Sequence, residues 1–402
     1  MTNTPLSEQP KIVLFGLRNA GKSSLVNNIF GREVSIVSNH AGTTTDPVTR
    51  SFELGKLGSV AIIDTAGFDD VGELGNLRVK KTIDRLEIAD IVILVSRGDT
   101  SLTREELEII EKYQNKNLII AFTFADGEIH TDNTKKIGQT PKVFINNITG
   151  EGIDLLKNTI IELFDHVKRE ITPVEGLTNE NDLVILVTPI DLAAPKGRLI
   201  LPQVETIRDL LDKDCSVLIV KERELRYIYD KLGVKPKLVI TDSQVFNKVA
   251  ADIPEDQMLT SFSILFARKK GDLAYFVEGA KYLKNIKPEG KILVLESCNH
   301  HKQADDIGTV KIPRLFKQLA EPSVTFEFAK EIPSSEKLKE YQLVINCAGC
   351  MVTKNDMTRR LDILKNNQIH ATNYGLFLAW AFGVLPRALE PFPYEYNLWI
   401  NN

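Results

Sequence analysis

The stretch Gly16-Leu17-Arg18-Asn19-Ala20-Gly21-Lys22-Ser23 decides the fold of the N-terminal part of this 402-residue chain. It follows an apolar run at 11–15 and precedes residues 24–30, whose apolar side chains have helical spacing. A strand, a glycine-rich turn and a helix in this order predict a phosphate-binding loop, because backbone N–H groups and a helix N-terminus then face one polyphosphate. The predicted nucleotide contacts in this loop are Asn19, Ala20, Gly21, Lys22, Ser23 and Ser24.

The P-loop assigns two side chains a specific role. We expect Lys22 to reach the β- and γ-phosphates and Ser23 to offer its hydroxyl to Mg²⁺. Composition is that of an ordinary soluble globular protein, with 43% hydrophobic and 26% charged residues. The net charge of −4 gives no general electrostatic footprint for nucleic acid, and no apolar run is long enough to span a membrane. The length predicts two or three domains.

A set of residues after the P-loop predicts a nucleotide switch. Thr44 lies in a polar, turn-rich segment that can bring it to Mg²⁺ and the γ-phosphate. Asp64 ends an apolar strand-like run, which places it opposite the P-loop to hold the Mg²⁺ shell, and Gly67 lets the backbone approach the γ-phosphate. These are the parts of a switch-type GTPase. Strand-like runs alternate with helical ones up to about residue 170, which predicts a doubly wound α/β domain over 1–170.

The base-recognition residues depart from the usual pattern of such enzymes. The strand at 118–123 is followed by Thr123-Phe124-Ala125-Asp126 where N/T-K-x-D is usual. We expect Thr123 and Asp126 to bind the guanine end, with Asp126 accepting from the base, so GTP is the predicted substrate. The next guanine loop is Asn146-Asn147-Ile148.

A second domain is predicted over 175–267, after a linker at 171–179 that contains Pro, Gly and polar residues. Strand-like runs, including one at 260–266, alternate with helical runs and predict another α/β layer. The segment has no phosphate loop and no cluster of acid, base and nucleophile. We interpret it as an interaction or spacer domain.

A third domain, over 270–402, contains three of the four cysteines. Strand-like runs at 291–296 and 342–346 end just before Cys298 and before the pair Cys347 and Cys350. If these strands are parallel, their carboxyl ends share one edge of the sheet and the three thiols converge. Such a set suits an iron–sulfur cluster, and zinc, a dithiol pair or plain buried cysteines are the alternatives.

The fourth ligand of such a centre is open. The sequence offers His300, or Asp305 or Asp306, or a position left for water or a partner molecule. The clustered cysteines in a large chain favour a metal site over disulfides, so a reducing, cytoplasmic location is predicted. The overall prediction is an α/β protein of three consecutive domains, the second and third smaller and with mostly parallel sheets.

Two resemblances add to this interpretation. Asn19 and the loop at 42–46 resemble the branch of GTPases that use K⁺ in place of an arginine finger, which implies K⁺ binding by Asn19. The chain as a whole resembles the [FeFe]-hydrogenase maturation GTPases. The motifs that carry this second resemblance are 16–24, 64–68, 72–75 with 78–81, Cys298-x-His300 and Cys347-Ala348-Gly349-Cys350.

The family resemblance implies a scaffold and carrier. Its members bind a [4Fe–4S] cluster through three cysteines, receive a di-iron precursor from radical-SAM maturases and deliver it to apo-[FeFe]-hydrogenase. The middle domain makes a homodimer, and GTP hydrolysis regulates partner exchange. The family motif usually has a histidine before the first cysteine of C-x-x-C, and Asn346 takes that position here.

The alternative function is that of a tRNA-modification or ribosome-assembly GTPase with a structural zinc site. It predicts a basic face and a nucleic-acid module after residue 170, and the net charge of −4 does not favour it. No nucleic-acid partner is therefore expected.

Overall fold

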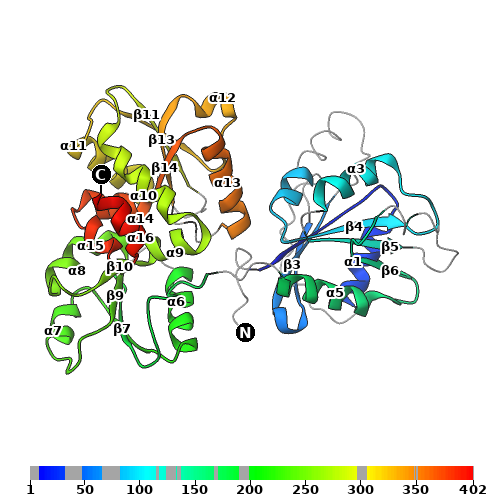
Figure 1. The fold of residues 1–402 in the computed structure, drawn as a ribbon, viewed down its shortest axis with the longest axis horizontal. Helices are drawn as coiled ribbons and strands as arrows, with labels where there is room; N and C mark the ends of the chain where they lie inside the picture. Colours follow the sequence, from blue (N-terminus) through cyan, green and yellow to red (C-terminus); the bar gives the residue numbers. More distant parts are fainter. Residues whose placement is uncertain are drawn as a thin grey trace. The chain divides into compact units, whose positions relative to one another are not determined.

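The computed structural model describes these residues: 9–31, 48–65, 82–114, 117–123, 133, 137–166, 171–189, 199–296, 306–347, 349 and 352–401. Contacts between residues divide the chain into two units, Met1–Arg169 and Glu170–Asn402 (Figure 1).

The first unit is built on a six-stranded sheet of order β2-β3-β1-β4-β5-β6. Its strands are β1 (Lys11–Phe15), β2 (Val48–Glu53), β3 (Ser59–Asp64), β4 (Ile91–Arg97), β5 (Leu118–Thr123) and β6 (Lys142–Phe144). Strand β2 is antiparallel to β3, and the other neighbours are parallel. The P-loop and the other strand-end segments of the parallel part therefore share the carboxyl edge, where open α/β sheets bind ligands.

Side chains alternate along each strand, so the two faces of this sheet pack against different helices. Ile12 and Leu14 share one core with α1 (Lys22–Phe30) and α5 (Ile153–His166). Val13 and Phe15 share the opposite core with α3 (Arg104–Tyr113). A continuous apolar run such as β1 is therefore buried on both faces, as a central parallel strand requires. A 3-10 helix, η1 (Gly55–Leu57), joins β2 to β3.

The second unit contains two four-stranded parallel sheets. The first has the order β10-β9-β7-β8, from β7 (Leu183–Val187), β8 (Ser216–Val220), β9 (Leu238–Thr241) and β10 (Leu259–Ser261). Its helices are α6 (Leu201–Asp212), α7 (Leu225–Tyr229), η2 (Ser243–Val245), α8 (Phe246–Asp252) and α9 (Phe262–Lys270).

The second sheet of this unit has the order β12-β11-β13-β14. Its strands are β11 (Lys291–Leu295), β12 (Thr325–Ala329), β13 (Tyr341–Asn346) and β14 (His370–Asn373). Its helices are α10 (Leu273–Tyr282), η3 (Leu283–Asn285), η4 (Ile307–Lys311), α11 (Ile312–Leu319), α12 (Ser335–Leu338), α13 (Lys354–Asn366), α14 (Tyr374–Ala381), α15 (Leu385–Leu389) and α16 (Pro393–Ile400).

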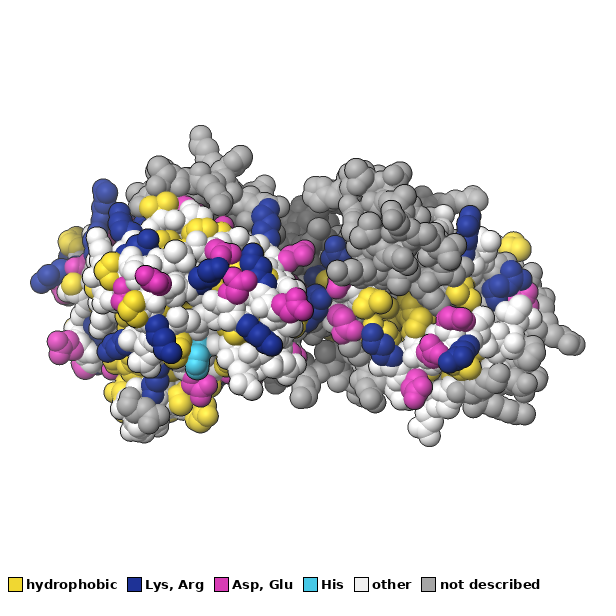
Figure 2. All heavy atoms as spheres, turned by 90° about the horizontal axis from the view of Figure 1, so that it is seen from above, with side chains coloured by type: hydrophobic (Ala, Val, Ile, Leu, Met, Phe, Trp, Pro, Cys, Tyr) yellow, Lys and Arg dark blue, Asp and Glu magenta, His cyan; other side chains and the backbone are white. Residues whose placement is uncertain are grey.

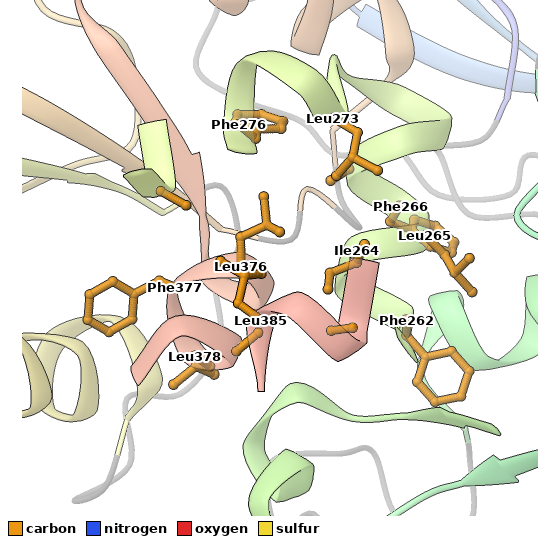
Figure 3. Packing of buried hydrophobic residues seen from close by; sticks show 14 of the residues in the cluster. Phe262, Ile264, Leu265, Phe266, Leu273, Phe276, Leu376, Phe377, Leu378 and Leu385 are labelled. Atoms are coloured by element: carbon orange, nitrogen blue, oxygen red, sulfur yellow. The ribbon is translucent and has the colours of Figure 1, made fainter. Parts of the chain in front are cut away.

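One hydrophobic core joins the two sheets of the second unit, and it runs from Val174 to Phe392. Helices α9, α10 and α14 meet in it, with Ile264, Phe276 and Leu376 among the side chains at their contact (Figure 3). The Thr260 hydroxyl of β10 donates to the carbonyl of Ala388 in α15, 3.1 Å away. Helix α15 therefore packs against the first of the two sheets of this unit. The fold class predicted from the sequence, α/β with a GTPase-like domain followed by two parallel-sheet layers, is confirmed. The division into domains at 1–170, 175–267 and 270–402 stays a prediction.

Two expectations within the second unit are wrong. The predicted strand at 260–266 ends at Ser261, and its remainder begins helix α9. The Ser261 side chain accepts a hydrogen bond from the backbone N–H of Ile264, and this N-cap turns an apolar run into a buried helix. Strand β14 was not predicted, because its four residues, HATN, carry no apolar alternation.

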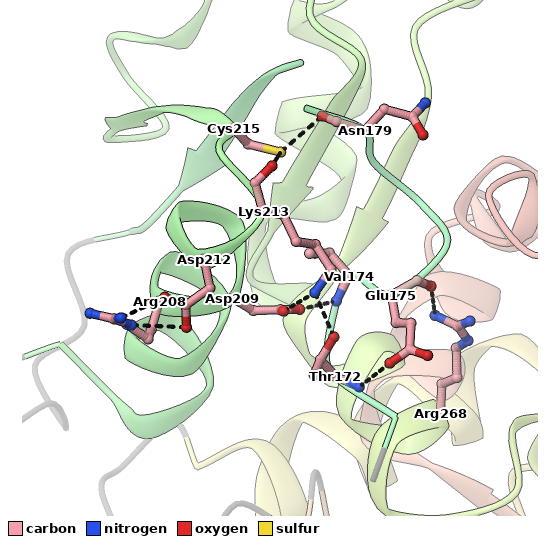
Figure 4. A network of polar contacts seen from close by, with 10 residues as sticks. All are labelled: Thr172, Val174, Glu175, Asn179, Arg208, Asp209, Asp212, Lys213, Cys215 and Arg268. Atoms are coloured by element: carbon pink, nitrogen blue, oxygen red, sulfur yellow. Dashed lines mark hydrogen bonds and ion pairs between the residues drawn. The ribbon is translucent and has the colours of Figure 1, made fainter. Parts of the chain in front are cut away.

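The segment predicted as a linker, 171–179, packs against the second unit (Figure 4). The backbone N–H of Val174 donates to the Asp209 carboxylate at 2.8 Å, and Arg268 donates to the carbonyl of Glu175 at 2.8 Å. Cys215 is buried, and its thiol lies 3.2 Å from the carbonyl of Asn179. Val174 itself is fully buried, so this segment belongs to the core.

In the part of the chain that the structure describes, none of the helices has the length and apolar character needed to cross a bilayer. The predicted cytoplasmic location stays a prediction.

Candidate functional site

The P-loop follows β1 and is shaped by close backbone contacts. A Cβ atom on Gly16 would lie 2.1 Å from the carbonyl oxygen of Val95, so only glycine fits beside β4 at this point. Gly21 has a φ of +88° and precedes the first residue of α1. The N-cap residue, Gly21, has no side chain to cap the helix, so a bound anion can take the place of a cap at the first backbone N–H groups.

The P-loop side chains of Lys22, Ser23 and Ser24 lie at the start of α1. The ammonium of Lys22 donates to the carbonyls of Gly16 at 2.8 Å and Leu17 at 2.7 Å, which holds it across the loop. Ser23 and Ser24 are exposed at the start of α1. The ammonium of Lys22, the hydroxyls of Ser23 and Ser24 and the N-terminus of α1 thus lie together at the carboxyl edge of the sheet. Groups of this kind bind polyphosphates.

Asp64 ends β3, next to β1 in the sheet. Its Oδ1 atom is buried without a hydrogen-bond partner in the described part of the chain. Burial raises the pKa of Asp64 above its ordinary value, and the charges of Lys22 and Arg50 oppose that rise. An oxygen that is buried, unpaired and within the field of the P-loop lysine suits a cation bound beside a phosphate.

Thr123 is fully buried and forms a hydrogen bond with the backbone of the P-loop. Its hydroxyl lies 2.7 Å from the carbonyl of Ala20 and 3.2 Å from that of Ser96. The side chain thus joins the ends of β4 and β5 to the turn before α1. In the described part of the chain, the Thr123 hydroxyl contacts the backbone carbonyls of Ala20 in the P-loop and Ser96 in β4.

Asn147, from the predicted second guanine loop, and Asn28, which was not selected from the sequence, make a second connection to the P-loop. The Asn147 side chain donates to the carbonyl of Gly21 at 3.3 Å, and Asn28 of α1 donates to the carbonyl of Asn147 at 2.8 Å. The loop after β6, which the sequence predicts to meet the guanine base, is therefore fastened to the P-loop. Because Asn28 and Asn147 are 119 residues apart, no local sequence pattern predicts that they form a hydrogen bond.

Asn19 is exposed and has a φ of +62°, in the left-handed region that asparagine tolerates better than most residues. This geometry accounts for an asparagine in the turn without any ligand, and it also leaves the side chain accessible. The K⁺ role of Asn19 stays a prediction.

Several predicted site residues lie outside the described part of the chain. They are Thr44, Gly67, Asp126, Cys298, His300, Asp305 and Cys350.

Cys347 follows β13 directly, at the carboxyl edge of the second unit's second sheet. Its thiol is half-buried, and its backbone N–H donates to the carbonyl of Leu295 at 3.0 Å. Strands β11 and β13 are parallel neighbours, with Leu295 opposite Asn346. The two strands therefore end side by side, as the parallel arrangement assumed from the sequence requires.

A polar group surrounds the end of these strands. Tyr374, the first residue of α14, places its hydroxyl 3.5 Å from Oε1 of Glu296, the residue after β11. A Cβ on Gly308 would lie 2.2 Å from that hydroxyl and 2.3 Å from that carboxylate, so both side chains would have to shift to admit a larger residue where η4 passes them. Burial raises the pKa of Tyr374, and the charges of Cys347, Glu296 and Asp306 raise it further. The hydroxyl therefore stays protonated.

Asp306, one of the predicted fourth ligands, caps η4. Its Oδ1 accepts from the backbone N–H and the hydroxyl of Thr309, both at 2.8 Å. In the described residues, no group of three or more His, Cys, Asp or Glu side chains is close enough to hold a metal ion. A metal centre at this edge therefore needs ligands beyond that part of the chain.

Comparison with known families gives one match in each section of the chain. Residues 11–124 match the family model described as 50S ribosome-binding GTPase. Residues 174–271 match the hydrogen maturase F dimerization domain, and residues 274–391 match its tetramerization domain. The second unit thus carries self-association domains of one family over most of its length.

Individual relatives match the first section alone. The tRNA modification GTPase MnmE of Moorella thermoacetica is 33% identical over 168 residues, which are 39% of this chain and 36% of that protein. MnmE of Natranaerobius thermophilus is 35% identical over 165 residues, 39% of this chain and 35% of that protein. The chain thus spans about a third of the length of these relatives.

Among solved structures, the G domain of the T. maritima FeoB iron transporter is 28% identical, with a TM-score of 0.31, over 39% of this chain and 99% of that one. The GTPase match in the first unit and the two hydrogen maturase F matches in the second together show that the chain is a GTP-hydrolysing member of the hydrogen maturase F family.

Proposed function

We propose that this hydrogenase maturation GTPase holds a [4Fe–4S] cluster in its second unit, receives a di-iron precursor there from radical-SAM maturases and transfers it to apo-[FeFe]-hydrogenase. The observation that carries the proposal is the position of Cys347 at the carboxyl edge of a parallel sheet, beside the end of β11. The chain continues from β11 to Cys298 within three residues, so two of the three cysteines start from neighbouring strand ends.

The donor set at this edge fits an iron–sulfur centre. A half-buried thiol with a buried amide next to it, Asn346, offers a soft ligand in a shielded position. Cys298, Cys347 and Cys350 would hold the cluster, which supplies a redox-active iron centre when bound. Three protein thiolates leave one iron open to His300, to a carboxylate such as Asp305, or to the incoming di-iron substrate.

In the first unit, the P-loop groups bind GTP. Lys22 exchanges its two carbonyl partners, Gly16 and Leu17, for phosphate oxygens, and the N–H groups at the start of α1 complete the phosphate cradle. Ser23 and Thr44 would hold Mg²⁺, with Asp64 in its shell. Asp64 suits this role because its buried Oδ1 has no other partner in the described residues.

Hydrolysis needs a positioned water and stabilised charge rather than a side-chain base. Lys22 and the N–H groups of the P-loop and of Gly67 neutralise the phosphate as charge moves to the leaving group. Asp126 and Thr123 would select guanine, with Thr123 acting through the P-loop backbone that it contacts. Loss of the γ-phosphate releases the segments of Thr44 and Gly67, and this change of state regulates partner exchange.

Iron reconstitution tests the cluster. After anaerobic incubation with iron and sulfide, we expect a brown protein with broad visible absorption, and we expect Cys347→Ser to lose most of that colour. Cys215→Ser is the matched control, because Cys215 is buried at 6% exposure in the other sheet's layer and should leave the colour intact. A colourless protein that retains one zinc ion would overturn the proposal.

The K⁺ role has a separate test. We expect GTP turnover to be faster in KCl than in NaCl, and we expect Asn19→Gly to abolish the difference while GTP still binds. Glycine keeps the left-handed turn at φ +62° and removes the side chain, including the amide oxygen that would bind K⁺. Equal turnover of the unaltered protein in the two salts would reject K⁺ binding by Asn19.

The rival function, a tRNA-modification type GTPase with a structural zinc, has less support. The MnmE similarity covers 39% of the chain, all of it in or near the first unit's sequence. On the face shown in Figure 2, basic and acidic side chains are interspersed rather than gathered into a basic surface. We therefore do not assign an RNA substrate.

A further inference from the structure

Asn346 has an unusual environment for an amide. It is the last residue of β13, it is 2% exposed, and neither its Oδ1 nor its Nδ2 has a hydrogen-bond partner among the described residues. A buried polar group without a partner is destabilising, and a carboxamide contributes two such groups. An apolar residue would be more stable here if the side chain served the fold alone.

The neighbouring amide shows the contrast. Asn373 of β14 lies opposite Asn346 in the register and is equally buried at 2% exposure. Its Oδ1 accepts from the N–H of Leu376 at 2.9 Å, and its Nδ2 donates to the carbonyl of Ser263 at 3.0 Å. Both ends of Asn373 thus serve the packing of α14 and α9, whereas Asn346 serves no contact of this kind.

The position of Asn346 in the sheet indicates which group could accept a hydrogen bond from its amide. It immediately precedes Cys347 and lies opposite Leu295, at the edge where β11 and β13 end together. Glu296 and Tyr374, two polar side chains at this edge, bond to each other. Among the described residues no acceptor bonds Nδ2 of Asn346, and a sulfur atom of a metal centre held by the adjacent Cys347 would be an acceptor of suitable chemistry.

We propose that Nδ2 of Asn346 donates a hydrogen bond to a sulfur atom of the iron–sulfur centre bound at Cys347, and that this bond raises the reduction potential of the centre. The inference rests on the proposed cluster function. Hydrogen bonds to cluster sulfurs withdraw electron density and favour the reduced state. An uncharged amide does this without adding a titrating group to a site that already contains Glu296. Asn346 is thus a positioning residue, acting on the centre through its sulfur.

The test replaces the amide with a side chain of similar size. In the metal-free protein, Asn346→Leu should unfold at an equal or higher denaturant concentration, because a buried unpartnered group is removed. After reconstitution, its cluster should have a more negative midpoint potential. We expect about a tenfold lower ratio of reduced to oxidised cluster at a fixed applied potential, equal to about 59 mV for one electron.

Thr372→Val is the matched control. Its hydroxyl is also fully buried and unpartnered in the described chain, one residue before Asn373 on β14. Because side chains alternate along a strand, it faces the side of the sheet opposite to Asn346. Thr372→Val should be as stable as the unaltered metal-free protein or more so, with no change of cluster potential. Asn346→Ala is the second variant if leucine prevents folding.

The outcomes separate the two proposals. An unchanged potential in both Asn346 variants, with a cluster present, would overturn this inference and leave the cluster intact as a proposal. Altered EPR g-values in these variants would overturn it in favour of direct ligation by Asn346. Failure of the unaltered protein to bind a cluster would overturn the proposed function and this inference together.

Discussion

At the scale of single residues, the nucleotide site depends on side chains that support the P-loop from outside the motif. Thr123 lies at the end of β5, yet its hydroxyl bonds the carbonyl of Ala20. Asn147 and Asn28 link a loop, the P-loop and α1. The geometry of the phosphate cradle is therefore fixed by partners up to 126 residues distant in sequence.

Removing the Thr123 hydroxyl should loosen this cradle. Thr123→Val keeps the shape but leaves the Ala20 carbonyl buried without its donor, which costs about 1–3 kcal/mol. We expect a lower stability of the first unit in urea and weaker binding of a fluorescent GDP analogue. Thr159→Val is the control, since the Thr159 hydroxyl bonds only Leu155 within an exposed turn of α5 and its loss should cost about 0.5 kcal/mol or less. Equal losses of stability in the two variants would show that the Thr123–Ala20 hydrogen bond contributes no more than the Thr159–Leu155 bond.

The charge of Asp64 makes a second prediction. Burial raises its pKa above the ordinary 3.8, so the folded protein binds that proton more tightly than the unfolded chain does. The corresponding stability is present at low pH and is lost as the pH rises through the raised pKa. Asp64→Asn should therefore raise the stability of the nucleotide-free first unit at neutral pH, with the gain shrinking toward pH 3.8, while GTP turnover falls.

Urea unfolding at a series of pH values measures this effect. Asp99→Asn is the control, because the Asp99 pKa is lowered by its bond to Arg97 at an exposed site, so this substitution should produce no gain. A loss of stability in Asp64→Asn at neutral pH would contradict the expected sign.

At the scale of elements, β8 is an edge strand with an unusual apolar surface. It is the last strand in the order β10-β9-β7-β8, and α6 packs against it. Ile219 of β8 is 44% exposed, and Val204 and Leu211 of α6 are 48% and 53% exposed. Exposed edges of this kind pair with other chains unless they are protected. The matching dimerization model covers this whole layer.

We expect this surface to take part in self-association. Burying a side chain such as isoleucine contributes about 1.5–3 kcal/mol, so Ile219→Lys should weaken the dimer by about tenfold or more. Sedimentation equilibrium measures the change. Tyr227→Lys, on the 62% exposed Tyr227 of α7, is the control and should leave the dimer unaltered. A dimer that tolerates Ile219→Lys would show that β8 is not in the interface.

At the scale of the whole molecule, the chain consists of two units with separate cores. The first holds the GTP site, and the second holds the two sheets that share one core. Because ligand binding stabilises only the folded region that it contacts, GTP should shift the unfolding transition of the first unit alone.

Calorimetry should resolve this difference. At a GTP concentration about 100-fold above Kd, we expect the transition of the first unit to gain about 2.7 kcal/mol and that of the second to stay unchanged. Lys22→Ala should abolish the gain. Equal shifts of both transitions would indicate that nucleotide binding couples to the second unit even at the level of global stability.

Local sequence patterns were sufficient for much of this description. The P-loop and the apolar strands follow from short segments, since glycine geometry and hydrophobic period act over a few residues. The parallel order of β11 and β13 was only a condition of the sequence prediction, and the structure meets it. The same reasoning failed at 260–266, where Ser261 caps a helix in an apolar run that fits a strand equally well. It also treated 171–179 as a linker, because the partners of Val174 and Glu175 lie in α6 and α9.

The sequence by itself therefore determined the α/β class, the GTP chemistry of residues 16–23 and the position of Cys347 after a strand. The tertiary structure alone decided which distant groups meet: Thr123 under Ala20, Tyr374 beside Glu296, and Asn346 buried without a partner. The physical reason is that propensity and motif geometry are properties of neighbouring residues. Hydrogen-bond satisfaction is a property of the whole packed chain, and it cannot be evaluated until every element has been placed.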